Sequence, residues 1–141
     1  MKNRKPIHDD WATPQYIYDY IEKEFFNDRK DYFDPCPLNA VFDGLILDWH
    51  DINYINPPYD RKVKEAFIRK AFEESKKGKL CVMLLPVSTS TKIFHEIIYS
   101  NAEIRFLKGR VKFKGVNSSG EYVDSKCGQH DSMIVIFKPL K

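Results

Sequence analysis

Residues 80–86 read Leu-Cys-Val-Met-Leu-Leu-Pro, an apolar run that Pro86 ends. Such a run, without polar residues between the apolar ones, is typical of a strand buried on both faces of a parallel sheet. The residues before it, 61–77, carry apolar side chains every three or four positions, and Gly78 ends this pattern. The sequence therefore predicts a helix that leads into a buried strand, which is characteristic of α/β domains.

The rest of the chain extends this prediction. Thr13-Pro14 is typical of a helix start, with Thr13 as N-cap, and predicts a helix over residues 14–27. A further helix is predicted over 91–100, and the polar, glycine-containing stretch 114–131 is predicted to be a long loop. Short strands are predicted at 32–33, 45–49, 52–55, 102–106, 111–113 and 133–137. This order predicts one α/β domain over residues 1–141, with a mainly parallel sheet and an antiparallel C-terminal end.

The composition is that of an ordinary folded protein. The chain has 141 residues, of which 43% are hydrophobic and 30% charged, so disorder is not expected. No apolar run approaches the roughly 20 residues that span a bilayer, and the N-terminal residues lack the apolar core of a secretory signal. The three cysteines are odd in number and far apart, which suits a reducing compartment. We therefore expect a cytoplasmic protein without a membrane partner.

The charge permits a nucleic-acid partner without requiring one. The formal net charge is +3, and basic residues are concentrated in residues 61–79 and 108–114. Both segments can equally be ordinary solvated surface. If the partner is a nucleic acid, these segments provide the candidate phosphate contacts. The candidates are Lys64, Arg69, Lys108, Arg110 and Lys112.

A second stretch, Asn56-Pro57-Pro58-Tyr59, follows the short strand predicted at 52–55. Ligands of open α/β sheets bind beyond the carboxyl ends of the strands, where Asp34-Pro35 is also predicted to lie. The side-chain oxygen of Asn56 and the carbonyl of Pro57 can accept both N–H groups of an exocyclic amine, which favours a pyramidal nitrogen with an available lone pair. The two prolines fix the backbone in this arrangement, and Tyr59 can stack on a base. An ordinary turn rich in Asn and Pro is the alternative.

With these residues, the chain resembles the small phage Dam-type DNA N6-adenine methyltransferases, which depend on S-adenosylmethionine. The resemblance covers nearly the whole chain. It rests on Trp11-Ala12-Thr13-Pro14, Phe33-Asp34-Pro35-Cys36, Asp48-Trp49, Asn56-Pro57-Pro58-Tyr59, Leu85-Pro86 and Gly109-Arg110-Val111-Lys112-Phe113. It implies a trimmed Rossmann-like methyltransferase fold and methylation of adenine N6 in DNA. Asn56, Pro57, Pro58 and Tyr59 would be the catalytic residues, and the bacterial host cytoplasm would be the location if a phage encodes the chain.

The resemblance also implies cofactor-binding residues. Asp34, Pro35 and Cys36 would replace the usual first cofactor motif, and Trp11, Thr13 and Pro14 would close over the cofactor. The stretch after Asp34 has no glycine, so the backbone cannot approach the cofactor as a glycine loop does. Side chains would have to compensate, and the candidates are Asn39, Asp48 and Trp49. Asp48 can equally be an exposed loop acid, and Trp49 a core aromatic.

The chain also lacks a separate target-recognition domain. Only residues 114–131 are left to read bases, so short or relaxed sequence recognition is expected. The side chains available there are Asn117, Ser118, Ser119, Glu121, Tyr122, Lys126, Gln129 and His130.

Other functions remain open at this point. The Asn-Pro-Pro-Tyr motif also occurs in enzymes that methylate an amine in RNA or a protein glutamine, and a catalytically silent nucleic-acid-binding module could share the fold. Pro35-Cys36 resembles the nucleophile motif of cytosine C5 methyltransferases, but no matching Glu motif follows, so Cys36 is better explained as a small buried thiol. Cys127 and His130 alone are too few for a zinc site, and no metal is expected.

Overall fold

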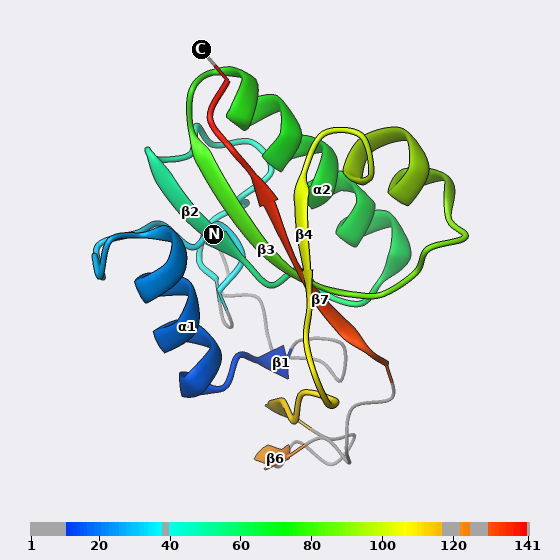
Figure 1. Cartoon of the computed structure of the whole chain (residues 1–141). Helices are drawn as coiled ribbons and strands as arrows, with labels where there is room; N and C mark the ends of the chain where they lie inside the picture. The colour runs from blue at the N-terminus through cyan, green and yellow to red at the C-terminus, as the bar shows by residue number, and fades with distance from the viewer. Residues whose placement is uncertain (1–10, 38–39, 117–121, 125–129, 141) are drawn as a thin grey trace.

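A computed structural model describes residues 11–37, 40–116, 122–124 and 130–140. Its elements follow the chain from β1 to β7 (Figure 1). They are β1 Trp11–Ala12, α1 Gln15–Phe25, β2 Ile52–Ile55, α2 Arg61–Lys76, β3 Leu80–Pro86, the π-helical turn η1 Phe94–Ile98, β4 Glu103–Phe106, β5 Lys114–Val116, β6 Tyr122–Asp124 and β7 Ser132–Phe137.

The main sheet has four strands in the order β2-β3-β7-β4. β2 and β3 are parallel, whereas β7 is antiparallel to both of its neighbours, β3 and β4. β2, β3 and β4 therefore run in one direction, and β7 lies between two of them in the opposite direction. A parallel bridge between Phe33 and Asn53 extends the sheet beyond β2. This arrangement confirms the predicted mainly parallel sheet with an antiparallel C-terminal end.

Helices cover both faces of this sheet (Figure 1). Along β3, Val82 and Leu84 belong to the apolar cluster that contains Ile17 and Ile21 of α1. Their neighbours Cys81, Met83 and Leu85 belong to a second cluster, which contains residues of α2 and η1. The central strands are therefore buried on both faces, which explains why the sequence of β3 is apolar without alternation.

The expected strand at 45–49 is wrong, because residues 44–46 form a turn and residues 47–49 are irregular. The backbone N–H of Leu45 donates to the Asp43 side chain at 2.9 Å, and the indole N–H of Trp49 donates to the carbonyl of Gly44 at 2.8 Å. These local bonds compete with pairing in a sheet. Ile46 is 76% exposed, so its apolar side chain does not mark a buried strand.

Three further predictions need correction. Val111 and Phe113 are buried, but residues 111–113 form no strand. The expected loop 114–131 contains β5 and β6, which form a small antiparallel sheet with β1 in the order β1-β5-β6. Thr13 is not the N-cap of α1, since Pro14 occupies that position and makes no side-chain cap bond.

Within the described residues, no helix is long and apolar enough to cross a membrane.

Candidate active site

The carboxyl ends of three strands meet at one edge of the main sheet. β2 ends at Ile55, and β3 and β4 end near the first residues of β7, because Pro86 pairs with Ser132 and Phe106 with Met133. Asp34 follows the Phe33 bridge at the same edge. This is the edge at which open α/β sheets bind their ligands. Asp34 and Asn56 therefore lie at the edge where the sequence predicted them.

The Asn56-Pro57-Pro58-Tyr59 corner joins β2 to α2. Pro57 and Pro58 are buried, whereas Asn56 and Tyr59 are half-buried. The helix begins directly afterwards, and the side chain of its N-cap Asp60 accepts from the backbone N–H of Val63 at 3.0 Å. The corner is therefore held between a fully buried strand and a capped helix, which limits its freedom to move.

Thr13 comes to this corner from the start of the described chain. The side-chain Nδ2 of Asn56 donates to Thr13 Oγ1 at 3.3 Å, and the same hydroxyl is hydrogen-bonded to the phenol of Tyr54. Tyr54 is fully buried. The structure thus brings together Thr13 and Asn56, but it also adds Tyr54, which sequence reasoning did not single out. Tyr54 is two residues before Asn56, so alternation along β2 places both side chains on the same face.

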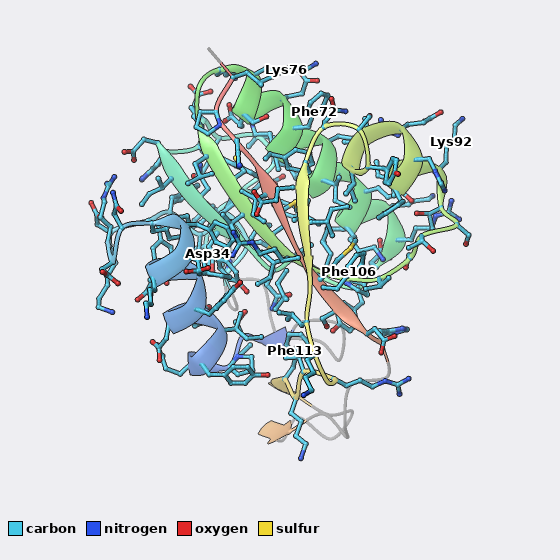
Figure 2. The ribbon with its side chains drawn as sticks, viewed as in Figure 1. Asp34, Phe72, Lys76, Lys92, Phe106 and Phe113 are labelled. Atoms are coloured by element: carbon cyan, nitrogen blue, oxygen red, sulfur yellow. The ribbon has the colours of Figure 1, made fainter. Side chains whose placement is uncertain are left out.

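Asp34, labelled in Figure 2, lies close enough to Tyr18 and Tyr54 for its charge to act on both. Burial raises the pKa of Tyr18 and Tyr54, and the negative charge of Asp34 raises both further. Asp34 also accepts a hydrogen bond from the backbone N–H of Cys36 at 2.8 Å, which closes a tight turn. Cys36 is a buried thiol, as the sequence suggested.

Two aromatic side chains from distant segments surround Tyr59. Its ring lies edge-on to Phe113, with centroids 6.3 Å apart, and edge-on to His130, with centroids 6.0 Å apart. Burial raises the pKa of Tyr59 to about 12, so its phenol is neutral at pH 7. No local pattern in the sequence connects His130 with Tyr59, which is why sequence reasoning missed this neighbour.

A pocket of about 290 Å³ lies beside the Asp34 turn. Its walls are mostly apolar and come from the turn, from the following segment and from α2. The lining residues are Pro35, Cys36, Ala40, Phe42, Asp43, Gly44, Leu45, Val63 and Phe67. Pro35 and Cys36 were predicted cofactor residues, whereas the rest of this lining was not foreseen.

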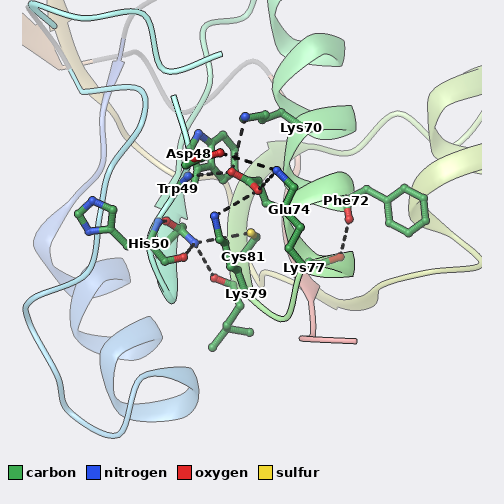
Figure 3. Close-up of polar contacts among 12 residues, drawn as sticks. Asp48, Trp49, His50, Lys70, Phe72, Glu74, Lys77, Lys79 and Cys81 are labelled. Carbon is green, nitrogen blue, oxygen red and sulfur yellow. Dashed lines mark hydrogen bonds and ion pairs between the residues drawn. The ribbon is translucent and has the colours of Figure 1, made fainter. Parts of the chain in front are cut away.

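Asp48 and Trp49 lie at the opposite end of β2, before its first residue Ile52 (Figure 3). Trp49 is 3% exposed and stacks on Phe67, with ring centroids 6.4 Å apart. Asp48 is exposed and lies 3.8 Å from the Lys77 ammonium. The structure does not bring either side chain to Asn56. Trp49 instead supports the pocket from behind, through Phe67 and through its bond to Gly44.

Figure 3 also shows why Trp49 is fixed in the core. Its backbone N–H donates to the fully buried carboxylate of Glu74 at 2.7 Å, and the ammonium groups of Lys77 and Lys79 lie 3.1 and 3.3 Å from that carboxylate. Burial raises the pKa of Glu74, but these bonds outweigh burial and lower the pKa to about 2.

The basic candidates are spread over two regions. Lys64 is half-buried in the first turns of α2, and burial lowers its pKa, whereas Arg69 is exposed farther along the helix. Lys108, Arg110 and Lys112 are exposed in the segment between β4 and Phe113, which contacts Tyr59. Arg110 forms an ion pair with Asp131 at 3.3 Å. The second region is therefore close to the corner.

Several predicted residues cannot be placed. Asn39, Asn117, Ser118, Ser119, Glu121, Lys126 and Gln129 lie outside the described residues. Only the backbone is described for Trp11, which pairs with Gly115, and for Tyr122 in β6. The described part of the chain contains no group of three or more His, Cys, Asp or Glu side chains suited to a metal ion.

Comparison with solved structures gives distant likenesses only. An S-adenosylmethionine-dependent O-methyltransferase from Thermotoga maritima has 14% identity and a TM-score of 0.35, with 67% of this chain and 35% of that chain covered. The tRNA (m1A58) methyltransferase TrmI from Aquifex aeolicus has 12% identity and a TM-score of 0.38, with 92% and 51% covered. This chain thus spans about a third of the length of the first protein and about half of the length of the second.

Comparison by sequence is more informative. A DNA N-6-adenine-methyltransferase of Haemophilus phage HP1 (strain HP1c1) is 31% identical over 149 residues, which cover 96% of this chain and 82% of that protein. Residues 1–141 match the family described as DNA N-6-adenine-methyltransferase (Dam). The chain belongs to the Dam family of DNA N-6-adenine-methyltransferases.

Proposed function

We propose that the corner Asn56-Pro57-Pro58-Tyr59 binds the exocyclic amine of adenine in DNA and that the methyl donor is S-adenosylmethionine. One observation carries this proposal. The corner lies at the carboxyl end of β2, and the amide nitrogen of Asn56 donates to Thr13 at 3.3 Å. The amide oxygen is thereby directed away from Thr13, as an acceptor for the substrate amine requires.

The chemistry needs acceptors rather than a base. The lone pair of the adenine amine is delocalised into the ring, which makes the nitrogen a poor nucleophile. Asn56 Oδ1 and the Pro57 carbonyl accept its two N–H groups and favour the pyramidal form that has an available lone pair. The neutral amine can attack before it loses a proton. Tyr59, whose pKa is about 12, therefore serves as an aromatic surface and not as a general base.

The pocket beside Asp34 fits the proposed cofactor. Its apolar lining, including Phe42 and Phe67, suits a purine ring, and the carboxylate of Asp43 suits hydroxyl or ammonium groups. S-adenosylmethionine, when bound, supplies an electrophilic methyl group. Pro35 and Cys36 line the pocket directly after Asp34, which lies at the same edge of the sheet as Asn56.

Adenine must leave the DNA stack to reach this corner. Tyr59, with Phe113 and His130 edge-on to its ring, provides an aromatic surface for the displaced base. Lys108, Arg110 and Lys112 are exposed in the adjoining segment and would contact phosphates, as would Lys64 and Arg69 on α2.

The test is to incubate the protein with S-adenosylmethionine labelled in its methyl group and with DNA, RNA or a glutamine-containing protein. The acceptor is then digested and analysed by mass spectrometry. We expect label on N6 of adenine from DNA. Label on cytosine, on RNA alone or on protein alone would contradict the proposal.

A further inference from the structure

The side chains of Asn56 and Tyr54 both bond to one hydroxyl group, that of Thr13. Thr13 Oγ1 accepts from Nδ2 of Asn56 at 3.3 Å and is hydrogen-bonded to the phenol of Tyr54. The ring of Tyr18 lies edge-on to that of Tyr54, with centroids 5.1 Å apart. A hydroxyl group has one proton and two lone pairs, so when Thr13 donates its proton to the phenol oxygen of Tyr54, it can only accept from the Asn56 amide.

The orientation of the Asn56 amide decides whether the corner can bind an amine. The planar amide has a donor on one side and an acceptor on the other. If the amide turned over, its oxygen would face Thr13, and its N–H groups would oppose the N–H groups of the substrate. Only the orientation in which the nitrogen faces Thr13 presents an acceptor to the amine.

Tyr54 in turn fixes Thr13. Its ring is fully buried, and it belongs to the core cluster that includes Ile17, Ile21 and Val82. Burial raises the pKa of its phenol well above the usual value, so the group remains a neutral hydrogen-bonding partner over the whole physiological range. The buried side chain of Tyr54 therefore fixes the Thr13 hydroxyl, and this hydroxyl in turn fixes the Asn56 amide.

We propose that Thr13 and Tyr54 are positioning residues that fix the Asn56 amide with its oxygen toward the substrate amine. This proposal rests on the proposed function of Asn56, and it gives Thr13 a role different from cofactor closure. It also explains why a buried strand carries a phenol two residues before the corner.

The test compares variants that remove one hydroxyl at a time. Thr13→Val keeps the shape of the side chain, and Tyr54→Phe keeps the ring. Both should lower kcat for DNA methylation by about 10- to 100-fold, as for other groups that orient a reacting side chain. The dissociation constant for S-adenosylmethionine, measured by calorimetry, should be unchanged. Thr13→Ser should restore most of the turnover that Thr13→Val removes.

Tyr32→Phe is the matched control. Tyr32 packs near the same cluster, but its phenol donates to Glu22 at 2.7 Å. This variant should keep the wild-type kcat. In an Asn56→Ala background, Thr13→Val should lower kcat no further, because the amide that it positions is absent.

A second readout separates this proposal from the proposed function. The side-chain amide signal of Asn56 in a ¹⁵N NMR spectrum, assigned by its loss in Asn56→Ala, should shift in Thr13→Val and Tyr54→Phe but not in Tyr32→Phe. An unshifted signal in Thr13→Val, or full kcat in that variant, would overturn the positioning role. A shifted signal in a protein that methylates no adenine would support the orientation and contradict the proposed function alone.

Discussion

The backbone of Gly44 lies against the carbonyl group of Pro35. A Cβ atom added to Gly44 would be 1.8 Å from the Pro35 oxygen, which is far closer than any side chain tolerates. The Asp34 turn itself contains no glycine. Gly44, in the segment that follows, is the residue whose lack of a side chain lets its backbone lie close to Pro35. Both residues line the pocket proposed for the cofactor.

Gly44→Ala should therefore weaken cofactor binding. The new methyl group has to push the segment around Gly44 away from Pro35, which deforms the pocket wall. We expect the affinity for S-adenosylmethionine, measured by calorimetry, to fall at least about 10-fold, corresponding to about 1.4 kcal/mol. Gly109→Ala is the control, since its φ of +75° costs stability but no described atom lies within 4 Å of the new Cβ. Equal cofactor affinity in the two variants would contradict the assignment of this pocket.

Glu74→Gln should destabilise the protein in a pH-dependent way. The bonds to Glu74 lower its pKa to about 2, below the ordinary value of 4.5, so the charged network stabilises the fold fully above about pH 4.5. This contribution disappears as the pH falls from about 4.5 toward 2. Removing the charge takes this buried partner away from Lys70, Lys77 and Lys79, at a cost of about 3 kcal/mol at pH 7.

Urea unfolding from pH 7 to pH 2 measures this effect. The free energy of unfolding should fall steeply below about pH 4.5 in the wild type and less steeply in Glu74→Gln. Glu73→Gln, on the exposed side of the same helix, should change little, because its ion pair with Lys76 is on the surface. Parallel pH curves for wild type and Glu74→Gln would show that the network does not provide this stability.

The sequence predicted those features that depend on local pattern. The apolar run of β3 indicated a strand covered on both faces. The two prolines after Ile55 indicated a corner at the carboxyl end of β2, the strand that pairs with β3. The structure bears out both. These features can be predicted from the sequence because a buried strand and a proline-restricted backbone each show in a few consecutive residues.

Features that depend on distant contacts were not predictable in this way. Trp49 was a candidate for cofactor stacking, but its partners are Gly44, Phe67 and Glu74, which surround it in the core. Apolar residues 45–47 suggested a strand, yet no strand in the described part of the chain pairs with them. The contact between Thr13 and Tyr54 joins residues 41 positions apart, and neither residue's neighbours indicate it.

Binding to DNA should depend strongly on salt. The double variant Lys108→Ala/Lys112→Ala removes two exposed charges in the segment that leads to Phe113. The slope of the logarithm of the DNA association constant against the logarithm of the salt concentration should become less steep by about 0.9 for each phosphate that is no longer neutralised. Lys76→Ala is the control, because Lys76 is at the far end of α2 and pairs with Glu73. Fluorescence anisotropy over a range of salt concentrations measures both, and an unchanged slope in the double variant would argue against this region as the phosphate contact.

Sequence recognition should be short or relaxed. Direct readout requires several side chains delivered to base edges. The main sheet and its helices use most of the described residues, which leaves the segment between β4 and β7 for this task. Sequencing of methylated bases in random-sequence DNA should show few defined positions around the target adenine. Strict methylation of one site of about six or more defined base pairs would contradict this expectation.

The most direct measurement is single-turnover methylation of adenine in DNA by Asn56→Ala, with cofactor affinity determined in parallel. The variant loses the acceptor that is needed in the transition state, so the rate should fall by roughly 100-fold or more. The dissociation constant for S-adenosylmethionine should change little. Asn101→Ala, which removes an exposed amide that donates to Ile97, should keep the wild-type rate. A loss of cofactor binding in Asn56→Ala, with an unchanged rate per bound complex, would contradict the role assigned to this corner.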